Sequence, residues 1–505
     1  MAHSVPKVNP WVVACIVSMA TFMEVLDTSI VNVALRYIAG DLGNSYDEST
    51  WTLTTYLVSN AVILPASGWL SNRLGRKRFY MGCVALFTIS SFFCGIAPNL
   101  MVLLFSRVCQ GIGGGGLAPS EQAILTDTFP PQKRGAAFAL YGVAVVVAPA
   151  IGPALGGWIT DTFSWRWIFF LNIPVGLLSL FLTYHFVPEE EKSGSDKSGK
   201  RIDFLGFGLV ALGLGCLQVV LDRGQIDDWF GSPMITTFAV VAAVALLIGL
   251  IHELTTKDPI VALPLMRNRS FFVSNVVMFF VGIVLFATTQ LIPQLTQDLF
   301  GYDATNAGLT LSPGGVIILL LMPLVGFLVS RVQPKYLIMF GFFTTGSALW
   351  YWTNLDLRAS FAELVFCRAI QAGGLAFLFV PINTIAYSGL PKGASNDASA
   401  LINLMRNYGG SVGVSIVQTM VSRRSQFHQA RLVETISNVN PVYYQQTHGP
   451  MHRTVGNIYA DIGAQAEMLS FLDIFKVLSI LSFIGVFVAL FLKRMNPNEK
   501  GEGGH

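Results

Sequence analysis

Four ionisable side chains interrupt stretches of sequence that are otherwise apolar. Glu24 and Asp27 are three residues apart, a spacing that places both on one face of a helix. Arg107 and Glu121 lie together in a later apolar stretch. An ionisable side chain inside a membrane costs several kcal/mol, so each of the four is a candidate functional residue. If the first stretch runs outwards and the later one inwards, Asp27 and Arg107 lie at similar depth and could form a pair.

A buried carboxyl group beside an arginine can load and release a proton. Removal from water raises the pKa of a carboxyl group, and a nearby guanidinium lowers that pKa again. A movement that separates Asp27 from Arg107 would therefore change proton occupancy, so we predict that both are proton-coupling residues. Glu24 and Glu121 are further candidates for the same role. The alternatives are a fixed structural ion pair, a capping role for Asp27, and glutamates that face a water-filled vestibule without titrating.

A third arginine, Arg406, lies with Asn403 and Asn407 in an apolar stretch nearer the C-terminus. Side chains of this kind either line a cavity or form hydrogen bonds between helices, and the residues alone leave both open. We predict that a substrate cavity is lined by polar side chains from both halves of the chain: Asn32, Gln290, Gln294, Asn403, Arg406 and Asn407.

The composition identifies the elements that must position these residues. Of the 505 residues, 53% are hydrophobic and 12% are charged, whereas a soluble domain has about 25% charged residues. A membrane-spanning helix needs about 20 mostly apolar residues, and we predict fourteen such helices in an all-α integral membrane protein. The first apolar stretch lacks a cleavage site of small residues and is predicted to be a span. The six cysteines fall within predicted spans without Cys-x-x-Cys spacing, so no disulfide framework, metal site or cofactor is predicted.

The distribution of basic residues predicts the orientation. An even number of spans puts both termini on one side, and most of the 32 Lys and Arg residues fall in segments on that side. Because basic residues concentrate in cytoplasmic segments, we predict that both termini are cytoplasmic. The net charge of +3 follows from this bias and gives no reason to propose a nucleic-acid partner.

An internal repeat predicts how the helices are grouped. Arg107-Val-Cys-Gln-Gly resembles Arg368-Ala-Ile-Gln-Ala, and each would lie in the fourth helix of a six-helix unit. This gives a six-plus-two-plus-six plan. The predicted segments are an N-terminal bundle (1–188), a charged cytoplasmic linker (189–202), two additional helices (203–255), a C-terminal bundle (256–495) and a cytoplasmic tail (496–505).

A long polar segment at residues 422–470 lies within the second predicted bundle, on the periplasmic side. It is too polar to span a membrane. A segment of this length in a compact protein usually has a function. It is either a solvated loop with short amphipathic helices or a docking surface for a periplasmic partner, and the sequence favours neither.

Two glycine-rich segments have structural explanations. The run that begins at Gly111 fits G-x-G-x-x-G, but no strand precedes it, so a dinucleotide site is excluded. Small residues that allow helices to pack closely explain the run better. In the second segment, Pro149 and Pro153 remove backbone hydrogen bonds, so we predict a bent helix that can act as a gate pivot.

Four motifs, taken together, resemble those of the EmrB/QacA-type drug:proton antiporters, the fourteen-helix branch of the major facilitator superfamily, and of its EmrB-like members in particular. The likeness runs along essentially the whole chain. The motifs are Leu26-Asp-Thr-Ser-Ile-Val-Asn-Val-Ala-Leu, Gly68-Trp-Leu-Ser-Asn-Arg-Leu-Gly-Arg-Lys, Arg107-Val-Cys-Gln-Gly and Gly152-Pro-Ala-Leu-Gly-Gly.

The resemblance implies roles for these motifs. Asp27 would be the acidic residue of the first span that is tied to proton coupling, with Arg107 as its partner. The other two motifs would act as a cytoplasmic latch and as the antiporter motif. Asn72 departs from the family, which often has Asp there, and Glu24 stands where a neutral polar residue can occur. The expected gating residues are Gly68, Asn72, Arg73, Gly75 and Arg76 in the latch, and Pro149, Gly152, Pro153, Gly156 and Gly157 in the antiporter motif.

The resemblance also implies a function. We expect a proton-driven exporter of lipophilic drugs in the bacterial inner membrane, surrounded by membrane lipid. EmrB-like members work with a periplasmic adaptor of EmrA type and an outer-membrane channel of TolC type, whereas QacA-like members act alone. The alternatives are a proton-coupled transporter of another small molecule, a membrane sensor and a membrane enzyme. A sensor would not need buried charges, and the sequence offers no convincing catalytic set.

Overall fold

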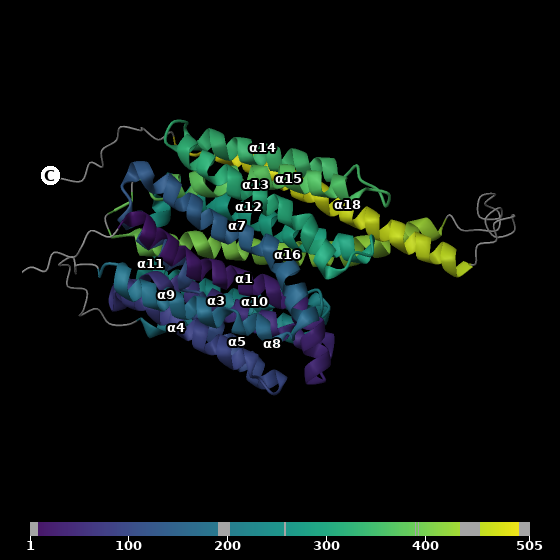
Figure 1. The fold of residues 1–505 in the computed structure, drawn as a ribbon, viewed down its shortest axis with the longest axis horizontal. Helices are drawn as coiled ribbons and strands as arrows, with labels where there is room; N and C mark the ends of the chain where they lie inside the picture. Colours follow the sequence, from purple (N-terminus) through teal and green to yellow (C-terminus); the bar gives the residue numbers. More distant parts are fainter. Residues whose placement is uncertain are drawn as a thin grey trace, which may run out of the picture.

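The computed structural model describes residues 9–189, 203–256, 259–388, 390–391, 393–434 and 455–493, and these residues form helices and no strands. Figure 1 shows the helices running side by side along the long axis. They are α1 (Pro10–Leu42), α2 (Tyr46–Ser49), α3 (Trp51–Leu74), α4 (Arg76–Gly95), α5 (Leu100–Gly114), α6 (Leu117–Thr128), α7 (Pro131–Thr162), α8 (Arg166–Phe170), α9 (Asn172–Phe186), α10 (Phe204–Arg223), η1 (Trp229–Gly231), α11 (Pro233–Thr255), η2 (Leu263–Arg267), α12 (Arg269–Asp298), α13 (Ala304–Val329), α14 (Pro334–Trp352), α15 (Phe361–Ala386), α16 (Ser395–Val433) and α18 (Val455–Ala489).

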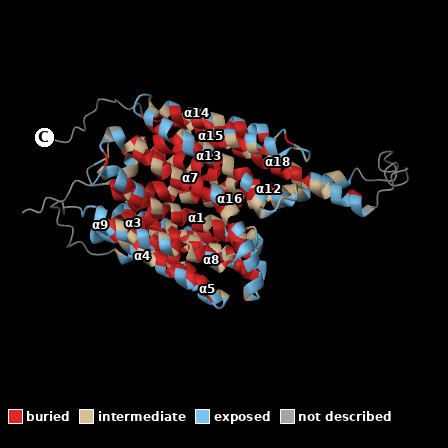
Figure 2. Cartoon of the chain, in the orientation of Figure 1, coloured by how far each residue is buried: buried red, intermediate tan, exposed pale blue. Residues whose placement is uncertain are grey.

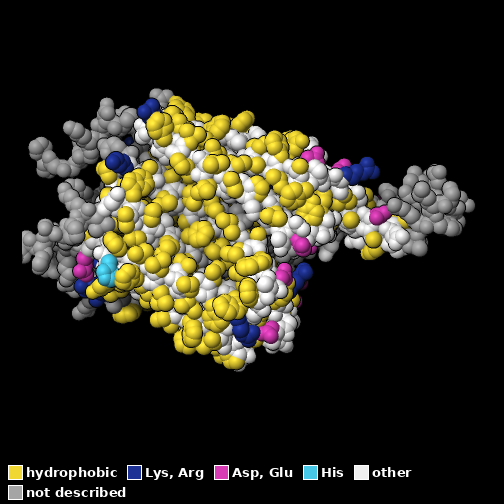
Figure 3. Space-filling view, in the orientation of Figure 1, with side chains coloured by type: hydrophobic (Ala, Val, Ile, Leu, Met, Phe, Trp, Pro, Cys, Tyr) yellow, Lys and Arg dark blue, Asp and Glu magenta, His cyan; other side chains and the backbone are white. Residues whose placement is uncertain are grey.

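The helices are those of a membrane protein. Within the described residues, ten helical stretches are long and apolar enough to cross a membrane; one of them joins α5 to α6 and another joins α8 to α9. An eleventh span results if the two arms of a bent helix are counted as one. Figure 3 shows hydrophobic side chains over the middle of the molecule, with charged side chains gathered towards its two ends. The predicted all-helical membrane fold is therefore confirmed. The count of fourteen and the cytoplasmic position of both termini stay predictions.

Two groups of helices meet along the centre of the molecule. The helices α1, α3, α4, α5 and α9 pack with one another, and so do α12, α13, α14, α15 and α18. The groups are joined by α7, which packs on α1 and α13, and by α16, which packs on α12 and α3. The pair α10 and α11 packs beside α3. Figure 2 shows that the buried residues concentrate where these groups meet.

The glycine run allows α5 and α6 to lie against the backbones of their neighbours. A Cβ atom on Gly111 would lie 2.0 Å from the Ser59 hydroxyl oxygen and 2.4 Å from the Tyr56 carbonyl oxygen on α3. On Gly113 it would lie 2.7 Å from the Phe87 backbone nitrogen on α4. The run therefore supports close helix packing, as predicted from the sequence.

Substitution of Gly111 by alanine is expected to destabilise the protein by at least about 1–3 kcal/mol, because the helices must separate to admit the methyl group. The measurement is thermal unfolding of the purified variant in detergent. Gly82→Ala on the neighbouring helix α4 is the matched control, since a Cβ atom there meets nothing within 4 Å. Equal melting temperatures for the two variants would contradict the prediction.

The α7 helix is bent, as its prolines predict. Its arms Lys133–Pro149 and Ile151–Thr162 meet at an angle of 44°. The arm Ile151–Thr162 packs tightly on α1, because a Cβ atom on Gly152 would lie 2.4 Å from the Ser29 hydroxyl oxygen. The pivot role of this bend stays a prediction.

The segment predicted as a polar loop at 422–470 begins and ends in regular helix. Residues 422–433 continue α16 and residues 455–470 open α18, and both helices extend beyond the rest of the molecule (Figure 1). The two extensions are held together by Asp473 of α18, which accepts hydrogen bonds from Arg424 and pairs with His428 of α16. These contacts let polar helices continue where the sequence indicates a loop. Residues 435–454 lie outside the described part of the chain, as do 190–202 and 494–505.

Candidate functional site

Asp27 and Arg107 form a buried ion pair, as their predicted similar depth allows. The Arg107 Nη1 donates to Asp27 Oδ2 at 2.6 Å, and neither side chain is exposed. The partners come from α1 and α5, which lie in the same group of helices. A pair of this kind must have its remaining lone pairs satisfied to offset the cost of removing both charges from water.

Neutral side chains from the surrounding helices complete the hydrogen bonds of Asp27. Its Oδ1 atom accepts from Gln110 Nε2 at 3.1 Å and from Asn172 Nδ2 at 2.7 Å. Asn172 also donates to the Ser91 hydroxyl at 3.0 Å. Sequence reasoning assigned none of these three residues to the site, although Gln110 is part of the Arg107-Val-Cys-Gln-Gly motif. Gln110 could have been found, because it follows Arg107 by three positions and therefore shares its helix face.

Tyr56 of α3 connects this ion pair to a second cluster of polar residues. Its ring lies 4.3 Å from the Arg107 guanidinium carbon, a cation–π contact. Its hydroxyl donates to Glu24 Oε1 at 3.1 Å, and Asn60 Nδ2 donates to the same oxygen at 3.3 Å. Glu24 and Asp27 therefore bind different partners although they are three residues apart on α1.

The second cluster lies between the two groups of helices. Glu24 is buried, and its Oε2 atom has no hydrogen-bond partner in the described part of the chain. Glu121 of α6 is also buried, with Oε1 bonded to Ser18 and Oε2 unpartnered within the described residues. The span predicted to hold both Arg107 and Glu121 is a single stretch, Leu100–Thr128, in which regular helix is interrupted only at Gly115 and Gly116 between α5 and α6.

Arg406 of α16 is a buried cation that amide side chains link to Glu24. Asn407 accepts from its guanidinium and donates to Asn60, which donates to Glu24. No ion pair joins Arg406 to Glu24 or Glu121 among the described residues. Its guanidinium instead donates to the Tyr141 hydroxyl of α7 and to Asn407. The buried site therefore holds two carboxyl groups and one guanidinium without direct contact.

Amide and hydroxyl groups join the two groups of helices around Arg406. Tyr141 donates to Asn403 at 3.1 Å, and Asn403 donates to Gln122 of α6 at 2.9 Å. Asn407 donates to Asn60 of α3 at 3.4 Å. Three residues predicted for the cavity, Asn403, Arg406 and Asn407, are thus brought together, and Gln122 and Tyr141 join them.

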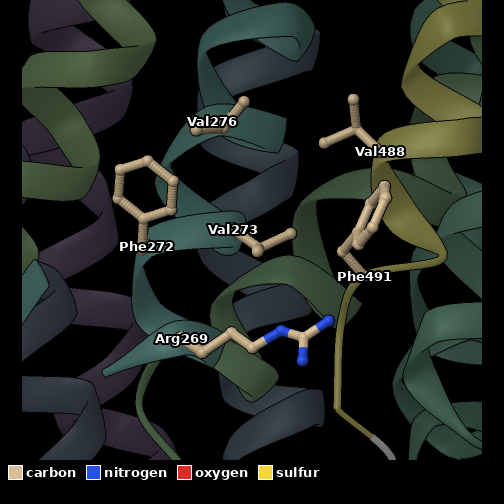
Figure 4. Close-up of a pocket in the computed structure, with 6 residues that line it drawn as sticks. All are labelled: Arg269, Phe272, Val273, Val276, Val488 and Phe491. Atoms are coloured by element: carbon tan, nitrogen blue, oxygen red, sulfur yellow. The ribbon is translucent and has the colours of Figure 1, made fainter. Parts of the chain in front are cut away.

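The remaining predicted cavity residues lie apart from this cluster. Asn32 is exposed on α1, and Gln290 and Gln294 are partly buried on α12. A cavity of about 330 Å³ on the C-terminal group contains none of them (Figure 4). Its lining is apolar apart from one arginine: Arg269, Phe272, Val273, Val276, Val488 and Phe491. We therefore treat the polar cluster, and not this cavity, as the candidate site.

The predicted latch residues connect the two groups of helices at one end. Arg76 Nε donates to Asn396 Oδ1 at 2.8 Å, and Arg76 also pairs with Asp127 of α6. A Cβ atom on Gly68 would lie 2.7 Å from Asp397 Oδ1, so α3 and α16 touch there. The turn at Gly75 has a φ of 88°, which favours glycine. Arg73 packs over the ring of Trp69.

Asn72, where the resemblance expects an acid, donates to Asp397 Oδ1 at 3.1 Å. Asn72→Asp is expected to weaken the latch, because two carboxylates would then face each other. The measurement is the rate at which a cysteine introduced beside the latch reacts with a water-soluble maleimide, which should rise.

The double variant N72D/D397N is the matched control. It restores a pair of one carboxylate and one amide, with the amide donor now on α16 and the carboxylate on α3. The rate of maleimide labelling should therefore return towards that of the parent protein. Equal labelling of N72D and the parent would contradict the prediction.

The antiporter motif places α7 between α1 and the second group of helices. The Ser29 hydroxyl donates to the Pro149 carbonyl oxygen at 3.3 Å. A Cβ atom on Gly156 would lie 3.0 Å from the Ile30 side chain. On the opposite side, a Cβ atom on Gly308 of α13 would lie 2.7 Å from the Ala154 backbone nitrogen. Pro153 and Gly157 lie on the same arm of α7.

Comparisons with known proteins identify the family. Residues 17–414 match the Major Facilitator Superfamily. The chain is 37% identical over 485 residues to the multidrug export protein EmrB of Haemophilus influenzae, with 94% of each chain covered. It is 37% identical over 481 residues to EmrB of Escherichia coli K12, covering 94% of this chain and 92% of the relative. It is 36% identical over 493 residues to the fatty acid resistance protein FarB of Neisseria gonorrhoeae, with 96% of each covered.

Solved structures share the fold at low sequence identity. The human organic anion transporter MFSD10 superposes with a TM-score of 0.58 at 13% identity, covering 94% of this chain and 99% of that one. The proton:xylose symporter XylE superposes with a TM-score of 0.60 at 14% identity, covering 97% of each. At these identities the likeness supports the fold alone.

Proposed function

This chain belongs to the Major Facilitator Superfamily, as an EmrB-type multi-pass transporter of the inner membrane and not an enzyme, and we propose that it exports lipophilic drugs in exchange for protons. The names of its relatives support multidrug export. The feature that supports proton exchange is the buried cluster of Glu24, Glu121 and Arg406 between the two groups of helices.

The cluster has the chemistry of a proton site. A buried carboxylate is costly unless it is paired and fully hydrogen-bonded, and each of these glutamates has one unpartnered oxygen within the described residues. A proton bound at either glutamate removes that cost. Arg406 provides a counter-charge from α16, which packs on both groups, so relative movement of the groups changes the electrostatic environment of both glutamates.

Alternating access between the two groups supplies that movement. When the groups separate at the outer end, water reaches Glu24 and Glu121, and a proton can bind. A lipophilic or cationic substrate that enters from the inner side would interrupt the contacts of Arg406 and favour proton release. We propose that Asp27 and Arg107 take part through Tyr56, which contacts both clusters.

For this cycle we propose the helix organisation that the sequence predicts. It has two six-helix bundles, at residues 1–188 and 256–495, with residues 203–255 as an additional pair of helices and both termini in the cytoplasm. In that orientation the latch around Arg76 closes the cytoplasmic end, and the extensions of α16 and α18 project into the periplasm.

We propose that these extensions bind a periplasmic adaptor of EmrA type, which leads to an outer-membrane channel of TolC type. Exposed large side chains on them support such a contact: Phe427, Val433 and Tyr459.

Substitution of these three residues by serine should reduce cross-linking to the adaptor and leave drug uptake into isolated vesicles unchanged. A stand-alone exporter, the alternative, would confer equal resistance in hosts with and without the channel.

Drug uptake into inside-out vesicles tests the proposal as a whole. Uptake should begin when a proton gradient is imposed and stop when a protonophore is added. A gradient-dependent uptake of sugars or amino acids, without drug uptake across a broad panel, would instead support a proton-coupled transporter of another small molecule.

A further inference from the structure

The C-terminal group of helices contains a buried arginine that has no carboxylate partner. Arg368 of α15 is 2% exposed. Its Nη1 atom donates to Gln371 Oε1 at 3.1 Å and to the Thr288 hydroxyl of α12 at 3.4 Å. No ion pair involves Arg368 among the described residues. A buried charge without a counter-charge is strongly destabilising.

The arrangement around Arg368 repeats the arrangement around Arg107, with one exchange. Asp27 lies 80 residues before Arg107, and Thr288 lies 80 residues before Arg368. A glutamine follows each arginine by three positions and accepts from its Nη1 atom. The second repeat therefore keeps the arginine and the glutamine but has a neutral threonine where the first has a carboxylate.

The loss of that carboxylate leaves buried donors without acceptors. In the first repeat Gln110 Nε2 donates to Asp27, whereas the equivalent Nε2 atom of Gln371 has no partner within the described residues. The Nε atom of Arg368 is also unpartnered there. The two side chains are hydrogen-bonded to each other through other atoms, so the free donors belong to neighbouring side chains.

The chemistry of the free donors selects the kind of ligand. The unpartnered atoms are the Nε atom of Arg368 and the Nε2 atom of Gln371. A guanidinium and the nitrogen of a side-chain amide can only donate hydrogen bonds, so this pair favours an anion over a cation.

We propose that Arg368 and Gln371 bind a monovalent anion in place of the carboxylate that Asp27 provides in the first repeat. The anion is chloride or the carboxylate group of an organic acid, since either supplies a negative charge and accepts several hydrogen bonds. The inference concerns a binding site and does not depend on drug export.

Thermal unfolding of the purified full chain in detergent tests the proposal. The titrations use sodium chloride and sodium acetate, with sodium isethionate added to hold ionic strength constant. We expect the melting temperature to rise and saturate, as it does when a ligand binds only the folded state. Saturation at lower chloride concentration identifies an inorganic ion, and saturation at lower acetate concentration identifies a carboxylate. A parent protein that responds to neither salt would overturn the proposal.

A substitution at the exchanged position provides a second test. Thr288→Asp supplies an internal carboxylate and should raise the melting temperature in isethionate while removing the response to added anion. Thr289→Asp, at the next position on α12, is the matched control and should keep the response. Gln371→Leu removes one donor and should raise the half-saturating concentration several-fold. An unchanged response in both Thr288→Asp and Gln371→Leu would overturn the proposal.

Discussion

Substitution of Glu24 by glutamine is expected to abolish proton-driven drug uptake while the protein stays folded. Glutamine has nearly the same shape and keeps an oxygen that can accept from Tyr56 and Asn60, the present donors to Glu24. It cannot bind or release a proton. Coupling free energies of about 1–3 kcal/mol correspond to roughly 5- to 150-fold effects, so we expect uptake to fall about tenfold or more.

Two measurements separate loss of coupling from loss of folding. The first is uptake of a fluorescent cationic drug into inside-out vesicles, normalised to the amount of folded protein. The second is proton release from the purified protein when drug is added, which the parent should show and Glu24→Gln should not.

Glu48→Gln is the matched control for this variant. Glu48 lies on α2, where its side chain caps the helix through Ser45, and glutamine can preserve that cap. The control should transport like the parent. Full proton-driven uptake in Glu24→Gln would remove Glu24 from the mechanism and leave Glu121 as the acid to test next.

The sequence predicts the parts of the site that depend on spacing along one helix or on the cost of burying charge. The Asp27–Arg107 pair follows from depth and charge, and the close packing at Gly111 follows from residue size. The bend in α7 follows from the chemistry of proline. Each of these three predictions requires only the geometry of a single helix and the energetic cost of placing side chains in a membrane.

Partners that depend on the packing of distant helices could not be predicted. Asn72 and Asp397 are 325 residues apart in sequence, and no local pattern indicates that they meet. Glu24 shares a helix face with Asp27, yet it turns towards Tyr56 because α3 passes beside it. The sequence predicts only short amphipathic helices within 422–470, whereas residues 422–433 and 455–470 continue long helices. Contacts between the two helices, such as those of Asp473, stabilise these polar extensions and cannot be predicted from local patterns.

Substitution of Asp27 by asparagine is expected to cause the largest loss of stability. The charge of Arg107 would remain buried at 0% exposure, and removal of one partner from a buried ion pair costs about 3–5 kcal/mol. The melting temperature in detergent should fall sharply, and less protein should reach the membrane. Uptake per folded molecule should also fall if the pair contributes to coupling through Tyr56.

A second substitution distinguishes a lost ion pair from a lost proton site. The double variant Asp27→Asn/Arg107→Gln removes both charges, so much of the stability should return because no uncompensated charge stays buried. Uptake should not return with it if the pair serves proton coupling. A single Asp27→Asn variant with the parent's melting temperature would contradict the structural role, since the ion pair would then contribute little to folding. Restored uptake in the stable double variant would assign Asp27 to folding and leave proton exchange to the cluster of Glu24, Glu121 and Arg406.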